Sequence, residues 1–175
     1  MNRLVLSSAL LALMTACTPP SAPAEPAVTV RVSPAPVILG QNLTFNLAVQ
    51  RVSEPLHVAV FVEDPAGHMI QLLPNRLPGG DPVLTPGQAV TFPAPGANYA
   101  LKAALPVGVH TVLAYATPAR LQDRVVSAYA SDSATFADVV PGRQGTGSLR
   151  GAMVPVLKLH QAGLVEYTTF TVTNP

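Results

Sequence analysis

From Val28 onward, the hydrophobic and polar positions of the chain alternate with the two-residue period of a β-strand. Residues 28–33 (VTVRVS) and 43–50 (LTFNLAVQ) follow this alternation, which predicts antiparallel strands that are buried on one face. Residues 58–62 (VAVFV) are apolar on both parities, which indicates a more central strand.

Turn sequences separate these apolar runs. Asp64-Pro65-Ala66-Gly67 predicts a turn, because Pro65 presets φ and Gly67 accepts positive φ. This turn should join strands 57–63 and 68–73 as a hairpin, which Pro74 ends. Further strands are predicted at 89–92, 99–105 and 109–117. Together they predict a mainly β fold, an immunoglobulin-like antiparallel β-sandwich of about seven strands.

The C-terminal third has a different pattern and predicts one or two short helices. Apolar residues over 120–130 fall on one helical face, and Asp132 or Ser133 is placed to cap a second turn with Phe136 and Val140. Residues 152–159 and 164–173 are predicted to form a final hairpin. A helix kinked at Pro155, over 148–161, is the alternative.

The N-terminus is predicted to be a lipoprotein signal peptide over residues 1–16. Arg3 precedes an apolar run, Leu4 to Met14, that is too short for a membrane span of about 20 residues. Met14-Thr15-Ala16-Cys17 resembles the bacterial lipobox, which implies cleavage after Ala16 and lipidation of Cys17. The alternatives are an ordinary signal peptide and a cysteine that stands at this position incidentally.

Residues 17–27, the lipidated cysteine and a proline-rich stretch, are predicted to form a tether of about 30 Å between the membrane and a single domain over 28–175. Thr18 stands where Asp would retain a lipoprotein in the inner membrane. This favours the outer membrane over the outer face of the inner membrane, within a bacterial cell envelope.

Composition narrows the possible functions. Only 11% of the 175 residues are charged, against roughly 25% in an average soluble domain. Removal of Arg3 with the signal peptide leaves nine of the ten basic side chains, against nine acidic ones, so the mature chain is close to neutral. A neutral chain gives no electrostatic argument for nucleic-acid binding. A single cysteine excludes an internal disulfide and a cysteine-rich metal site.

Candidate chemistry is sparse. The four histidines, His57, His68, His110 and His160, form no local zinc-binding spacing. His57 and His68 should meet across the predicted hairpin, so a metal site with His110 is an alternative to partly exposed strand histidines. Glu63 and Asp64 offer carboxylates for a hard cation. The favoured interpretation is that Asp64 accepts hydrogen bonds within its own turn. No catalytic, cofactor-binding or metal-binding residue is predicted.

Several short sequences between residues 56 and 121 resemble the bacterial family catalogued as domain of unknown function 4384. The matching pieces are 60–64 (VFVED) with Gly67, 71–75 (QLLPN), 86–88 (PGQ), 92–96 (FPAPG), Tyr99 and 111–117 (TVLAYAT). The resemblance implies a small β-rich accessory domain of the kind found in envelope lipoproteins, and it implies no catalytic residues.

These observations predict a non-catalytic envelope lipoprotein, held on the membrane through Cys17, that needs no cofactor. Its charge-poor surface favours a binding or scaffolding role against another envelope protein or polymer. The alternatives are a structural or stress-related lipoprotein without a dedicated ligand and a metal-dependent hydrolase.

Overall fold

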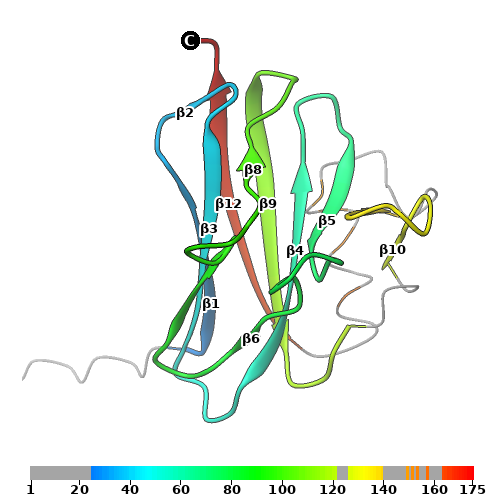
Figure 1. The fold of residues 1–175 in the computed structure, drawn as a ribbon. Coiled ribbons are helices and arrows are strands. Elements are labelled where there is room, and N and C mark those ends of the chain that lie inside the picture. The colour runs from blue at the N-terminus through cyan, green and yellow to red at the C-terminus, as the bar shows by residue number, and fades with distance from the viewer. Residues whose placement is uncertain are drawn as a thin grey trace, which may run out of the picture.

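A computed structural model describes residues 25–121, 126–139, 149, 151, 153, 157 and 163–175. Within these residues the chain forms twelve β-strands arranged in two sheets (Figure 1). The predicted mainly β fold is therefore confirmed. Among the described residues, no helix is long and apolar enough to cross a membrane.

The smaller sheet is built around one long strand near the N-terminus. Its strands, in spatial order, are β1 (Ala27–Ser33), β3 (Asn42–Gln50) and β7 (Ala89–Phe92), and β8 (Leu101–Lys102) pairs with the start of β3. All these pairings are antiparallel, with Val30 opposite Leu47 and Phe45 opposite Phe92. The alternation predicted for β1 and β3 is confirmed, since β3 is buried at every second residue.

The larger sheet contains the two longest strands of the described chain. In spatial order its strands are β10 (Ser127–Ala128), β11 (Ala137–Val139), β5 (Met69–Leu73), β4 (Leu56–Glu63), β9 (Gly108–Thr117), β12 (Leu164–Thr173) and β2 (Val37–Ile38), and β6 (Val83–Leu84) pairs with β4. The β2–β12 pair is parallel and the others are antiparallel.

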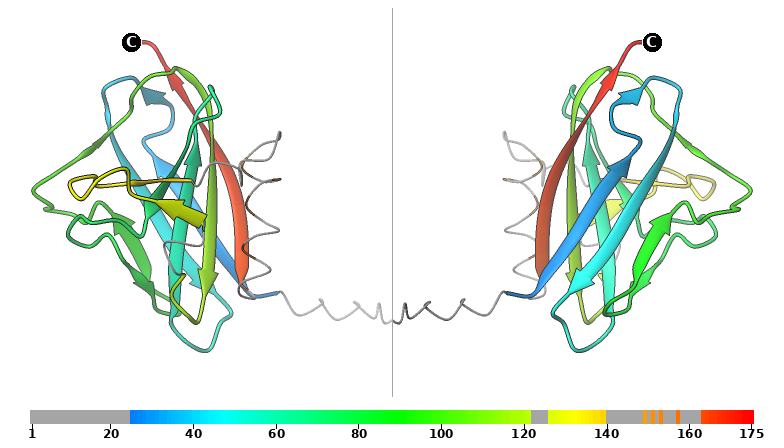
Figure 2. Two further views of the ribbon diagram at one scale, coloured as in Figure 1. Left: turned by 90° about the vertical axis from the view of Figure 1, so that its right-hand side faces the viewer. Right: turned by 90° about the vertical axis from the view of Figure 1, so that its left-hand side faces the viewer.

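The two sheets face each other across one hydrophobic core (Figure 2). Val30 and Leu47 from the smaller sheet and Val60 and Val112 from the larger sheet belong to the same buried cluster. On one side β1 lies beside β12, so the two layers meet there.

The central strands of the larger sheet are covered on both faces, as the pattern of 58–62 predicts. Phe61 and Tyr115 point away from the first core and form a second cluster with Leu149, Met153 and Leu157. These three residues are spaced four apart, as on one face of a helix. Within 148–161, for which a strand over 152–159 or a kinked helix was predicted, the structure describes Leu149, Gly151, Met153 and Leu157, and all four are in helical conformation. The other residues of this range lie outside the described residues.

The short helices predicted for the C-terminal third are not shown by the structure. Strands β10 and β11 lie within the two predicted ranges, while residues 122–125 and Val140 lie outside the described residues. The reason is tertiary: Ala137 and Asp138 pair with the outer edge of β5, and this pairing overrides the weak helical spacing. The strand at 164–173 is confirmed, but its long antiparallel partner is β9.

Candidate functional site

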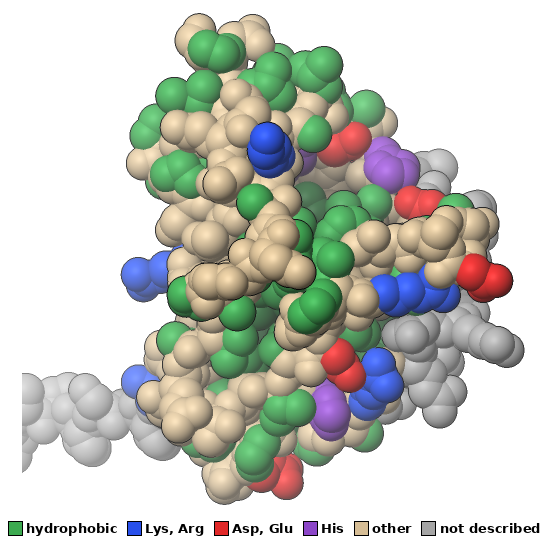
Figure 3. Space-filling view, in the orientation of Figure 1, with side chains coloured by type: hydrophobic (Ala, Val, Ile, Leu, Met, Phe, Trp, Pro, Cys, Tyr) green, Lys and Arg blue, Asp and Glu red, His purple; other side chains and the backbone are tan. Residues whose placement is uncertain are grey.

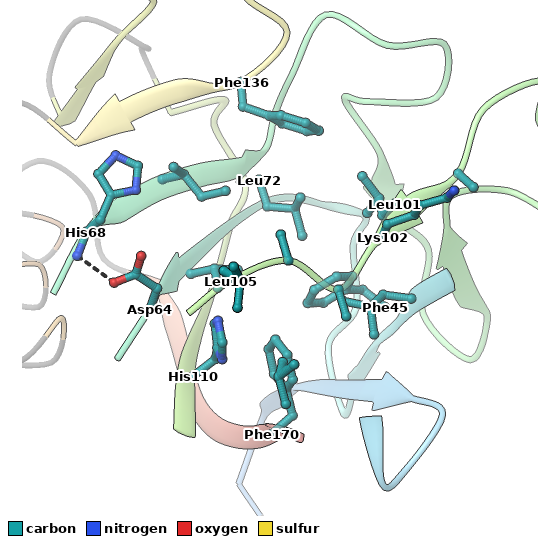
Figure 4. Close-up of a pocket in the computed structure, with 17 residues that line it drawn as sticks. Phe45, Asp64, His68, Leu72, Leu101, Lys102, Leu105, His110, Phe136 and Phe170 are labelled. Atoms are coloured by element: carbon teal, nitrogen blue, oxygen red, sulfur yellow. Dashed lines mark hydrogen bonds between the residues drawn. The ribbon is translucent and has the colours of Figure 1, made fainter. Parts of the chain in front are cut away.

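A cleft of about 410 Å³ opens between the two sheets, between β8 and the β4–β5 hairpin (Figures 3 and 4). We call it the apolar cleft, because hydrophobic side chains line most of it and are visible in the hollow of Figure 3. Its lining residues are Leu43 and Phe45 of β3, residues 100–105 along β8, Val62, Asp64, His68, Ile70 and Leu72 around the β4–β5 hairpin, Phe136, and His110, Phe170 and Val172. A cavity of this size and lining is typical of ligand-binding sites.

Stacked rings form one end of the apolar cleft. The imidazole of His110 is stacked on Phe170, with 4.9 Å between ring centroids and 17° between planes, and Phe170 meets Phe45 edge-on at 6.4 Å (Figure 4). His110 is buried, and its Nδ1 lies 3.3 Å from the carbonyl oxygen of Gly108. This end of the cleft is therefore held by aromatic packing across β3, β9 and β12.

The charged groups at the rim are mostly occupied by structural contacts. The Oδ1 of Asp64 accepts hydrogen bonds from the backbone N–H groups of Ala66 at 2.8 Å and His68 at 2.9 Å (Figure 4). The Nε2 of His68 lies 3.3 Å from Asp138. Lys102 is exposed and has no ion pair within the described part of the chain. It is therefore the rim cation that remains open to a ligand.

Tyr99 connects parts of the two sheets beside the apolar cleft through a hydrogen bond and a ring contact. Its hydroxyl donates a 2.7 Å hydrogen bond to the carbonyl oxygen of Pro78, and its ring packs against Phe92 of the smaller sheet. Burial raises the pKa of the Tyr99 phenol, so this donor keeps its proton at neutral pH. The loop that carries Pro78 follows β5, so this bond links the loops next to the two cleft walls.

The loop after β5 is organised by a buried asparagine. Asn75 donates from Nδ2 to the carbonyl oxygen of Leu72 at 2.6 Å and accepts at Oδ1 from the N–H of Leu77 at 2.8 Å. Its own N–H donates to the carbonyl oxygen of Gly80 at 2.6 Å. Asn75, which follows Pro74, therefore has a structural role: it positions the loop whose Pro78 carbonyl accepts the hydrogen bond from Tyr99.

Arg76 holds a second loop in place, and sequence reasoning missed it. One guanidinium nitrogen lies 2.6–3.2 Å from the carbonyl oxygens of Ser131, Asp132 and Ala134, and the group stacks 3.8 Å over the ring of Tyr129. This loop leads directly into Phe136, so Arg76 helps to position one wall of the apolar cleft. Backbone carbonyls are its partners, and they leave no signal in residue types.

The predicted meeting of His57 and His68 is wrong. His57 pairs with Thr117 near the start of β4, whereas His68 follows the turn at the other end of that strand. The reason is the strand itself, which runs through eight residues and separates the two side chains by its length. Among the described residues, no group of three His, Cys, Asp or Glu side chains converges on one point. Cys17 and His160 lie outside the described residues.

The two acidic residues of the hairpin have separate structural partners. The favoured interpretation of Asp64 is confirmed by the two hydrogen bonds within its own turn. Glu63 accepts a 2.8 Å hydrogen bond at Oε2 from the N–H of Leu149, a residue of the second hydrophobic cluster. Both carboxylates therefore support the fold.

No curated protein and no solved structure matches this chain. Residues 37–120 match the family described as "Domain of unknown function (DUF4384)", a longer match than the 56–121 predicted from the short sequences. The match runs from β2 through the end of β9 and includes most residues of the apolar cleft. The chain therefore contains a DUF4384-like domain.

Proposed function

We propose that the protein is a non-catalytic accessory module of the bacterial cell envelope, anchored by lipid, that binds a partner through the apolar cleft. The observation that carries this proposal is the cleft itself, about 410 Å³ of largely apolar space open to solvent at the edge of the sandwich. Leu105, at its rim, is 72% exposed and continues the apolar lining of the cleft to the surface.

The arrangement of the strands supports an immunoglobulin-like sandwich as the scaffold. The order β1-β3-β7 corresponds to strands A, B and E of that fold, and the order β5-β4-β9-β12 corresponds to C′, C, F and G. Scaffolds of this class commonly bind ligands at their strand edges and end loops, while the core has only a structural role.

The polar groups at the cleft support binding rather than chemistry. Asp64 is engaged by two backbone N–H groups, and His110 is stacked on Phe170. The Oδ1 of Asp64 and the Nδ1 of His110, which lies 3.3 Å from the carbonyl oxygen of Gly108, thus have partners within the fold, and this supports a binding role.

Lipidation of Cys17 would place the apolar cleft at the end of the domain that faces away from the membrane. Pro26, near the end of the predicted tether, lies beside Leu164 and Ala116 at one end of the β9–β12 ladder. The cleft is lined by Val172 and His110 at the other end of the same ladder. The module is therefore suited to contact a partner across the periplasm or at the surface, and the outer membrane is the favoured location.

The anchor is tested by membrane fractionation of a Cys17→Ala variant. We expect the variant to leave the membrane fraction, while wild type stays in it and is released by detergent. Undiminished membrane association of Cys17→Ala would contradict the lipid anchor.

Binding through the cleft is tested by comparative capture. Cells that express tagged wild type, Ile70→Thr or Val90→Thr are cross-linked, solubilised in detergent, and the captured proteins quantified by mass spectrometry. Both changes replace a partly buried apolar strand residue, but only Ile70 lines the apolar cleft. We expect Ile70→Thr to lose a partner that Val90→Thr retains. Equal recovery from all three would favour a structural role without a dedicated ligand.

A further inference from the structure

The strand β8 presents an unpaired backbone edge to the apolar cleft. The N–H of Ala103 donates to Gln41 at 2.8 Å, and its carbonyl oxygen accepts from Gly40 at 2.9 Å, so Ala103 faces the smaller sheet. Successive residues of a strand direct their backbone groups to opposite sides. Lys102 and Ala104 therefore direct theirs outward, on a side where β8 pairs with no other strand of the described chain.

The two sheets differ in width on this side of the sandwich. The smaller sheet ends at β7 and β8, whereas the larger sheet continues from β4 through β5 to β11 and β10. Ile70 and Phe136, which lie at this extension, are only partly buried and line the apolar cleft. The cleft thus occupies the position of one further strand of the smaller sheet, next to β8 and facing β5.

We propose that an extended segment of the partner protein adds to the smaller sheet as a strand beside β8. This inference rests on the proposed function and specifies its ligand. The added strand would lie about 4.8 Å from β8 and exchange hydrogen bonds with Lys102 and Ala104. Its alternate apolar side chains would enter the apolar cleft against Ile70 and Phe136, and a carboxylate on its outer face would pair with Lys102.

A polypeptide fits this site better than an alkyl chain does. An alkyl chain would fill the apolar space but leave the outward N–H and C=O groups of Lys102 and Ala104 without partners. Pro95 and Pro106 lie on either side of the free edge, so it accepts a short strand and resists open-ended sheet growth.

The test uses the full chain in detergent and the probe acetyl-Glu-Val-Thr-Val-Thr-Val-Glu-amide, followed by amide hydrogen exchange at single-residue resolution by NMR. Strand addition predicts an alternating result along β8. The amides of Lys102 and Ala104 should slow at least tenfold, while those of Leu101 and Ala103, already directed at β3 and its turn, should change little. Uniform slowing, or no slowing at millimolar peptide, would overturn the proposal.

Two matched changes separate backbone pairing from filling of the cleft. Ala104→Pro removes one outward N–H and changes only one small side chain of the cleft lining. N-methylation of alternate peptide amides removes the same class of bond from the probe. Each should weaken peptide binding at least tenfold. The N-methylated probe requires no change in the protein, so it decides the outcome if Ala104→Pro fails to fold.

The remaining outcomes have distinct meanings. If Ile70→Thr abolishes binding but N-methylation has no effect, the proposed function stands and strand addition is overturned. If neither change weakens binding, the apolar cleft is not the site and both proposals fail. Tighter binding of dodecanoate than of the peptide at this cleft would overturn strand addition in favour of an amphiphile. Dimerisation through β8, seen by sedimentation, would overturn it in favour of a second copy of the chain.

Discussion

Replacement of Gly80 by alanine should destabilise the loop that receives Tyr99. A Cβ on Gly80 would overlap the Oδ1 of Asn75, lie 2.6 Å from its Cγ and lie 2.8 Å from the carbonyl oxygen of Leu77. Asn75 would have to move, and its hydrogen bonds to Leu72 and Leu77 would break. Each bond contributes about 1 kcal/mol and a buried group left unpaired costs about 1–3 kcal/mol, so the expected loss is about 3 kcal/mol.

Urea unfolding followed by circular dichroism measures this loss, and the melting temperature should fall by about 6–12 °C. Gly79→Ala is the matched control, since nothing lies within 4 Å of its Cβ position and its φ of +75° costs only about 1 kcal/mol. In an Asn75→Ala background, Gly80→Ala should cost at least about 1.5 kcal/mol less than in wild type, because the overlap with the side chain is gone. Additive effects of the two changes would refute the reasoning.

Three further predictions concern the core and the cleft. Burial raises the pKa of Tyr115 more than its hydrogen bond with Thr117 lowers it. The free energy of unfolding should therefore be highest below about pH 10 and should decrease as the pH rises through the raised pKa. Tyr115→Phe should remove part of this decrease, measured by urea unfolding at pH 8–11. Phe170→Ala should cost about 2 kcal/mol in the same assay, since two ring contacts are lost, whereas a cost near zero would contradict the ring packing at the cleft. Gln71→Leu should cost about 2 kcal/mol, because this buried amide donates to Pro74 at 2.9 Å and accepts from Ser127 at 2.5 Å; an unchanged midpoint would show that the buried pair contributes nothing.

The fold could be predicted from sequence where one face of a strand is buried over many residues. The alternation of residues 43–50 and the turn at 64–67 lead directly to β3 and to the β4–β5 hairpin. Strands β10 and β11 could not be found this way, because two or three residues are too short to establish a period. They are strands because the outer edge of β5 offers them a partner.

The candidate site depends on contacts that no local pattern reports. The apolar cleft exists because the smaller sheet ends at β8 while the larger sheet continues beyond β5. Leu105 and Ile70, which lie on its two walls, are far apart in the chain. The free edge of β8 follows from the bonding of Ala103 to the turn before β3, and the residue types there give no indication of it.

Photo-cross-linking in living cells tests the central claim most directly, with p-benzoylphenylalanine placed at Leu105 or at Val83. Both positions are exposed hydrophobic residues, at 72% and 44%, but only Leu105 lies at the apolar cleft. The proposed binding module predicts a discrete protein adduct from Leu105 that Val83 does not give and that Ile70→Thr abolishes. The same adducts from both positions, or none from Leu105, would contradict it.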